Sequence, residues 1–198
     1  NNARAVADFH TAFNLILALI FFPVLKPYAA LLRRWMPARI DPADPGLPLY
    51  LDPAARETPV IALGAAAREA LRMADALEKM LVGLRNTFED ANRRQISDTK
   101  RLDDVLDKLN TAIKSYVTSL DTEELGEADH ARLREILTFT TNMEHAGDVV
   151  DKNLLGSANK MVKRGVTFSK SGQAELLAMI DRLIANVRTA ASLFMTGD

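Results

Sequence analysis

The chain has no cysteine among its 198 residues, which excludes disulfide bonds, thiolate zinc sites, iron–sulfur clusters and cysteine nucleophiles. It has only three histidines, so a three-histidine metal site would need all of them. The nine glycines and eight prolines are too few turn-forming residues for an all-β protein, and this favours helices. The 25 basic and 26 acidic side chains nearly cancel. This argues against a nucleic-acid-binding protein, because such a protein carries a basic surplus.

An apolar run near the N-terminus differs from the rest of the chain. From Ala12 to Leu25 it reads AFNLILALIFFPVL, and Asn14 is its only polar side chain. The run is apolar on every face rather than on one stripe. With its flanks it approaches the ~20 residues that a membrane-spanning helix needs. We therefore predict a transmembrane helix in residues 1–35, with membrane contact over residues 9–35.

The charges around this run set its expected orientation. Four basic residues follow it before residue 40, and positively charged flanks stay in the cytoplasm. Residues 36–198 are therefore expected to be cytoplasmic. Two alternatives are a secretory signal peptide, whose basic residues would precede the apolar run, and a buried helix of a soluble bundle.

A proline-rich segment, residues 36–58, follows the predicted membrane helix. Six prolines lie between Pro37 and Pro59. Proline at this density forbids helix and favours an extended, semi-rigid linker. We place the domain boundary in this segment and assign residues 59–198 to a second domain.

Residues 59–198 show the periodicity of helices. Apolar residues recur at spacings of three and four in four segments, which cover about 59–88, 97–120, 127–155 and 173–194. Residues 156–172 contain three glycines and are expected to form a looser connection. The predicted fold is all-α: an N-terminal transmembrane helix, a linker and an antiparallel helical bundle with short turns.

Acidic residues follow the apolar stripes of two of these helices. Glu144, Asp148 and Asp151 share one flank of the third helix at spacings of four and three. Asp103 and Asp107 have the same relation to the stripe of the second helix. Oxygen-only clusters suit hard cations, namely magnesium, manganese, calcium or carboxylate-bridged iron. These five acids are therefore the predicted metal ligands, and the alternative is a solvated acidic face.

The stretch from Asn142 to Asn153, NMEHAGDVVDKN, resembles the ExxGD signature in the third helix of PhoU-type domains. The preceding stretches EALRMADALEKM and LDDVLDKLNTAIKSYVTSL fit the helices that open such a repeat. The stretch DFHTAFNLILALIFFP resembles the last transmembrane segment of bacterial sodium/phosphate cotransporters. Such proteins carry a cytoplasmic PhoU-like domain at their C-terminus, so the resemblance covers essentially the whole chain.

The resemblance implies a fragment of a sodium-dependent inorganic phosphate transporter at the cell inner membrane. Its PhoU-like bundle, residues 59–198, is expected to regulate phosphate transport, with divalent or iron cations (Mg, Mn, Fe) on the acidic pairs. The expected partners are the membrane and an upstream transporter domain of the same polypeptide, with sodium and phosphate bound at residues outside this chain. Only one ExxGD signature occurs, so the second repeat is expected to be truncated, and homo-oligomerisation is left open.

The sequence does not predict an enzyme. Glu127 and His130 have the spacing of a di-iron helix, but that chemistry needs a second Glu-x-x-His, which the chain lacks. Lys160, Lys163 and Arg164 near Ser169 carry charge that attracts anions, although basic loop residues are usually solvated. The alternative function is a single-span signalling or structural module without metal. Metal binding that is lost in Glu144→Ala or Asp148→Ala would distinguish the two.

Overall fold

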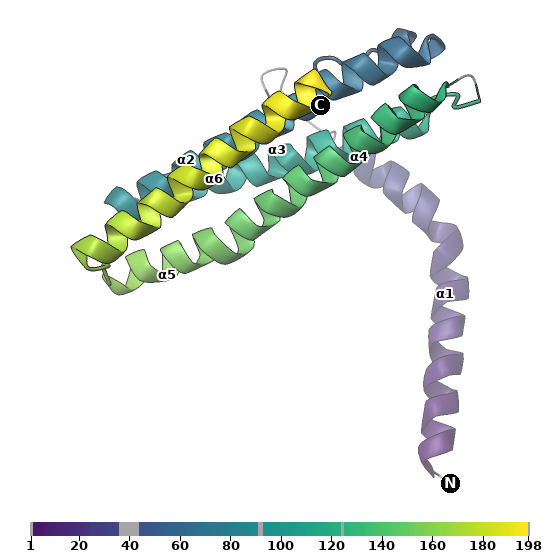
Figure 1. Ribbon diagram of the computed structural model, residues 1–198. Coiled ribbons are helices and arrows are strands. Elements are labelled where there is room, and N and C mark those ends of the chain that lie inside the picture. Colours follow the sequence, from purple (N-terminus) through teal and green to yellow (C-terminus); the bar gives the residue numbers. More distant parts are fainter. Residues whose placement is uncertain (1, 36–43, 91–92, 124, 198) are drawn as a thin grey trace. The chain divides into compact units, whose positions relative to one another are not determined.

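The computed structural model describes residues 2–35, 44–90, 93–123 and 125–197 of the chain (Figure 1). It divides into two compact units, residues 1–43 and residues 44–198. Within the described residues both units are helical, and neither contains a β-strand. This confirms the predicted all-α class.

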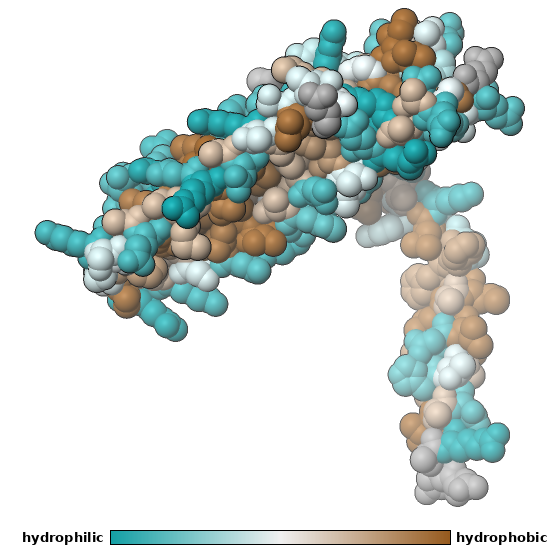
Figure 2. Space-filling view, viewed as in Figure 1, coloured by the Kyte–Doolittle hydropathy of each residue, from teal (hydrophilic) through white to brown (hydrophobic). Residues whose placement is uncertain are grey.

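The first unit contains one long helix, α1 (Asn2–Trp35). Its part from Arg4 to Trp35 is long and apolar enough to cross a membrane by length and composition, and its most apolar window is not buried at all. Figure 2 shows apolar side chains over much of this helix. The helix continues through Pro23 and Pro27.

The second unit is a bundle of long helices. Its first helical element is a 3₁₀-helix, η1. A π-helix, η2, joins α4 to α5, so that the three form one continuous rod (Figure 1). The bounds are η1 (Ala54–Glu57), α2 (Pro59–Asp90), α3 (Arg93–Thr118), α4 (Glu127–Asp148), η2 (Val149–Leu155), α5 (Gly156–Arg164) and α6 (Lys170–Thr196).

Helix α2 is the centre of this bundle, because it contacts α3, α4 and α6. The apolar stripe predicted for it is buried over its whole length, and Met73, Met80 and Leu84 are fully enclosed. Leu106, Leu109 and Ile113 of α3 and Ile136 of α4 complete the core. Burial of one stripe from each helix is the packing that their spacing predicts.

Helices α3 and α4 lie close together at Gly147. A Cβ atom at this position would collide with the side chain of Leu106, which is fully buried on α3. Glycine weakens a helix interior by about 1 kcal/mol relative to alanine. Here its missing side chain is what lets the two backbones come together.

The segment predicted as a linker, residues 36–58, is described from residue 44 onward, and residues 36–43 lie outside the described residues. The described part belongs to the same unit as the bundle. Pro53 does not prevent helix there, since it precedes the 3₁₀-helix η1, and proline is tolerated at the start of a helix. We call residues 44–57 the strap.

The connection predicted over residues 156–172 is shorter than expected. Residues 156–164 are helical, and only residues 165–169 form the turn before α6. Gly156 did not end the helix because its neighbours Leu155 and Ala158 are buried in the core, and this burial offsets the weak helix propensity of glycine.

An apolar groove separates α6 from α4 and η2. Leu183 of α6 is 44 % exposed because it faces this groove. The groove has a volume of about 390 Å³, and Leu77 and Leu81 of α2 contribute to its lining. Figure 2 shows apolar side chains along the bundle between these helices. At one end α4 and α6 do meet, where the rings of Phe139 and Phe194 stack at 4.0 Å.

Candidate functional site

The close approach at Gly147 brings acidic side chains of two helices together. Asp103 of α3 has its Oδ1 atom 3.5 Å from the place where a Cβ atom of Gly147 would lie. The charges of Asp107, Asp148 and Asp151 all act on this carboxyl group. The structure therefore gathers four of the five predicted ligands, and we call these four the aspartate cluster.

Asp103 is the member most affected by this arrangement. Burial, and after it repulsion from Asp151, Asp107 and Asp148, together raise its pKa from 3.8 to about 6. Both effects disfavour the charged carboxylate, because it loses water and meets like charges. Asp103 therefore takes up a proton much more readily than an ordinary aspartate does.

Lys152 supplies the positive charge at this cluster. Its Nζ atom lies 2.6 Å from Oδ1 of Asp148, and attraction to Asp148, Asp103 and Asp107 helps to raise its pKa. Lys152 is on η2, one helical turn after Asp148. The ammonium group thus partly offsets the repulsion that the four carboxylates create.

The fifth predicted ligand, Glu144, is not among the charges that act on Asp103. Its carboxylate lies 3.7 Å from the Nε2 atom of His145 instead. Within the described ranges, no group of three or more acidic or histidine side chains is arranged to hold a metal ion. The aspartate cluster is therefore a concentration of negative charge rather than a preformed coordination sphere.

The backbone at the cluster is irregular. Residues 149–155, which include Asp151 and Lys152, form the π-helix η2. A π-helical turn is rare and is found frequently at functional sites. The sequence predicted an uninterrupted α-helix here, because the spacing of its apolar residues does not reveal the wider π-helical turn.

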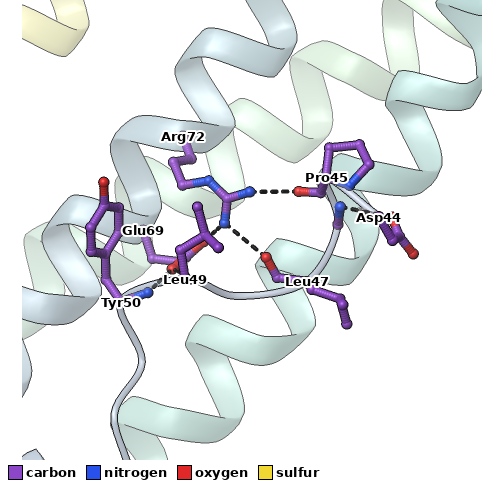
Figure 3. Close-up of polar contacts among 8 residues, drawn as sticks. Asp44, Pro45, Leu47, Leu49, Tyr50, Glu69 and Arg72 are labelled. Atoms are coloured by element: carbon purple, nitrogen blue, oxygen red, sulfur yellow. Dashed lines mark hydrogen bonds and ion pairs between the residues drawn. The ribbon is translucent and has the colours of Figure 1, made fainter. Parts of the chain in front are cut away.

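A second polar site fastens the strap to α2 (Figure 3). Glu69 is fully buried (0 % exposed) although it is an acid. Its Oε2 atom accepts hydrogen bonds from the backbone N–H groups of Leu49 at 2.9 Å and Tyr50 at 2.8 Å. Its Oε1 atom accepts one from the guanidinium of Arg72. Three donors thus compensate the buried charge.

Arg72 extends this contact along the strap. Its Nη1 atom donates to the carbonyl oxygen of Leu47 at 2.9 Å, and Nη2 donates to that of Pro45 at 2.7 Å. We call the pair Glu69 and Arg72 the strap clamp. Figure 3 shows both side chains reaching from α2 to the strap backbone.

Helix α3 holds the strap at two further points. Lys108 pairs with Asp44 at 2.6 Å. The hydroxyl of Tyr116 donates to the carbonyl oxygen of Asp52 at 2.8 Å, and Arg56 lies 5.0 Å from the centre of the Tyr116 ring. The strap is therefore bound to both helices over nearly its whole length.

Sequence reasoning missed the strap clamp, but a signal for it exists. Glu69 lies three residues after Ala66 and four before Met73, so it occupies the apolar stripe of α2. An acid on a core stripe requires a buried partner, and Arg72 follows at the spacing of one helical turn. The backbone acceptors and donors of the strap could not be assigned from spacing alone.

Comparison with known proteins finds one matching family and a set of similar proteins. A family described as the PhoU domain matches residues 70–152, which include most of α2, all of α3 and α4, and the aspartate cluster. The chain is also homologous to proteins named "Putative inorganic phosphate export protein YjbB". No solved structure matches the chain.

The similarity to these relatives runs over nearly the whole chain. The chain is 35 % identical to the Escherichia coli K12 protein over 196 residues, which is 99 % of this chain and 36 % of the relative. It is likewise 35 % identical to the Salmonella typhimurium protein over 201 residues. The chain thus spans about a third of the length of these relatives.

The raised pKa of Asp103 predicts a pH-dependent stability. The folded pKa, about 6, lies above the ordinary value of 3.8, so the folded state binds this proton more tightly than the unfolded state. Stability is therefore lost as the pH rises from about 4 through 6. Asp103→Asn should increase the unfolding free energy by about 1 kcal/mol at pH 7.5, after screening, and have little effect at pH 4.

Denaturant unfolding at the two pH values measures this difference. The matched control is Asp98→Asn, because Asp98 is exposed and its ion pair with the exposed Arg101 is long, at 4.0 Å. Its effect should be within about 0.5 kcal/mol at both pH values. A destabilising effect of Asp103→Asn at pH 7.5 would contradict the assignment.

The strap clamp predicts a local loss of protection. Glu69→Gln removes the charge from three hydrogen bonds and leaves a neutral amide in a fully buried place. We expect destabilisation of about 2 kcal/mol or more, because hydrogen bonds to charged groups are worth about 1.5–3 kcal/mol. Amide hydrogen exchange should accelerate at Leu49 and Tyr50, while Asp98→Asn leaves these amides unchanged. Unaltered exchange at both amides in Glu69→Gln would show that Glu69 does not hold the strap.

Proposed function

We propose that this chain is the regulatory part of an inorganic phosphate transport protein. In this proposal α1 lies in the inner membrane, and residues 44–198 form a cytoplasmic PhoU domain that sets the transport activity. The supporting observation is the conjunction of the PhoU match over residues 70–152 with homology to phosphate export proteins over 99 % of the chain.

The exposed apolar surface of α1 supports the membrane assignment. Large apolar side chains such as Phe9, Leu19 and Phe22 are each more than 70 % exposed within the chain. Exposure of apolar surface to water is unfavourable by roughly 25 cal/mol per Å². A bilayer removes this cost over the length of α1.

The strap supports a mechanical role for the bundle. It follows α1 in the chain and is bound to α2 and α3 by the strap clamp, Lys108 and Tyr116. Movement of these helices would therefore displace the chain close to its entry into the membrane. A freely jointed linker would not transmit such a movement.

The transport reaction itself is assigned to the remainder of the polypeptide. One membrane helix cannot enclose a permeation path. We propose that sodium and phosphate bind in an upstream transporter domain, as the resemblance to sodium/phosphate cotransporters implies. The relatives' name favours export as the direction of phosphate movement.

The experiment that tests this function uses the complete gene product in cells loaded with labelled phosphate. Removal of residues 44–198 should change the phosphate efflux rate about five-fold or more, the usual size of an allosteric coupling. Glu69→Gln should shift the rate in the same direction, and Asp98→Asn should leave it unchanged. An efflux rate that is independent of residues 44–198 would contradict the regulatory role.

A second proposal concerns the signal that the bundle detects. The aspartate cluster concentrates negative charge, and its member Asp103 has a raised pKa, so a divalent cation would relieve its repulsion. We propose that Mg²⁺, Mn²⁺ or an iron cation binds there through Asp103, Asp107, Asp148 and Asp151, displacing the ammonium of Lys152. Glu144, the other predicted ligand, would have to leave His145 to join them.

Metal binding predicts a shift in the melting temperature of the detergent-solubilised chain. Saturating Mn²⁺ or Mg²⁺ should raise the melting temperature, because a ligand that binds only the folded state stabilises it. Asp148→Ala should abolish the rise, and Asp98→Asn should retain it. An unchanged melting temperature at saturating metal would exclude metal binding and leave the regulatory proposal standing.

A further inference from the structure

The turn between α5 and α6 carries an unusual concentration of positive charge. Residues 152–174 contain five basic residues and no acidic residue, in a chain whose 25 basic and 26 acidic side chains nearly cancel overall. Lys152 pairs with Asp148. The other four, which have no ion pair among the described residues, are Lys160, Lys163, Arg164 and Lys170. We call residues 160–170 the basic turn.

Apolar side chains lie between these cations and face solvent. Val166 is 57 % exposed and Phe168 is 48 % exposed. The ring of Phe168 makes a T-shaped contact with that of Phe88 at the end of α2, with the ring centres 6.0 Å apart. About half of the Phe168 surface and more than half of the Val166 surface face solvent. Figure 2 shows hydrophilic side chains projecting around this end of the bundle.

The backbone of the turn is fixed rather than loose. Gly165 adopts a left-handed conformation with φ of +64°, which ends α5. The N–H of Val166 donates to the carbonyl oxygen of Met161 at 3.2 Å, and the Ser169 hydroxyl accepts from the N–H of Gly172 at 3.2 Å to cap α6. Val166 is therefore held outward between two rigid helix ends.

We propose that the basic turn is a docking surface for an anionic bilayer. Unpaired cations around exposed apolar side chains fit the boundary between lipid headgroups and acyl chains. Each Lys or Arg at an anionic leaflet favours attachment by about 1 kcal/mol, or about five-fold in affinity. A nucleic acid or a free phosphate ion would use the cations and leave Val166 and Phe168 without a role.

The chain itself brings this surface near a membrane, and here the inference rests on the proposed membrane location of α1. A tethered second contact gains a high effective concentration. Along α2 the strap clamp at Arg72 and the turn contact at Phe88 are 16 residues apart, or about 24 Å. The strap thus keeps the basic turn about 24 Å along α2 from the segment that follows α1 in the chain.

The absence of cysteine makes a direct test simple, because any single introduced cysteine can be labelled specifically. The full chain is placed in nanodiscs of phosphatidylcholine, with or without phosphatidylglycerol. Spin labels are attached to Val166→Cys for the turn and Leu19→Cys for α1. Collision with a water-soluble paramagnetic reagent then reports whether each site is shielded by lipid.

We expect the label at Val166→Cys to be shielded about five-fold or more only when phosphatidylglycerol is present, and to be released by high salt. Lys163→Glu with Arg164→Glu should abolish the shielding. The matched control, Arg134→Glu with Arg182→Glu, reverses two exposed arginines elsewhere in the bundle and should preserve it. Both pairs are on the surface, and circular dichroism verifies that the helices persist.

Three results would overturn the proposal. The first is equal exposure of the label at Val166→Cys in both lipid mixtures. The second is that the control pair of substitutions also abolishes the shielding. The third is that inorganic phosphate produces the same shielding in neutral nanodiscs. The label at Leu19→Cys tests α1 separately. If it is buried while Val166→Cys stays exposed, only the docking surface fails. If it is exposed, the proposed membrane function of α1 fails whatever the turn does.

Discussion

The buried carboxylate of Glu69 is the constraint on which the arrangement of the second unit depends. Burial of an unpaired charge is prohibitively costly in a protein interior, so Glu69 can stay on the core stripe of α2 only while its donors are present. Two of its donors belong to the strap and the third is Arg72. The strap is therefore part of the folded bundle, and the N-terminal approach to the bundle is fixed by a core requirement.

The aspartate cluster differs from Glu69, because its negative charges are not fully compensated. Glu69 is surrounded by donors, whereas Asp103 meets three other carboxylates and a single ammonium group. The imbalance appears as the raised pKa of Asp103, and it is maintained because Gly147 lets α3 and α4 approach closely. Because this repulsion is retained, a proton or a cation at the cluster would change the interaction of α3 with α4 and η2. The fully compensated Glu69 offers no such response.

The apolar spacing was sufficient to predict the long helices of the bundle and the shared position of the acids beside the stripes of α3 and α4. It was not sufficient where a contact depends on atoms that have no pattern in the sequence. The strap is bound largely through its backbone groups, which every residue carries, so its prolines indicated only an extended chain. The helical continuation through Gly156 depends on the burial of Leu155 and Ala158, which outweighs a local preference. Glu69 did break the pattern, and its position on an apolar stripe was the available clue.

Helix α3 connects the two polar sites. Asp103 and Asp107 belong to the aspartate cluster, and the next residue, Lys108, holds Asp44 of the strap. Farther along the same helix, Tyr116 holds the strap again at Asp52. A rigid helix moves as a unit, so a shift of α3 against α4 that relieves carboxylate repulsion also moves the points where the strap is attached. The aspartate cluster and two attachment points of the strap therefore lie on one element, with no chain of intermediate residues through the core between them.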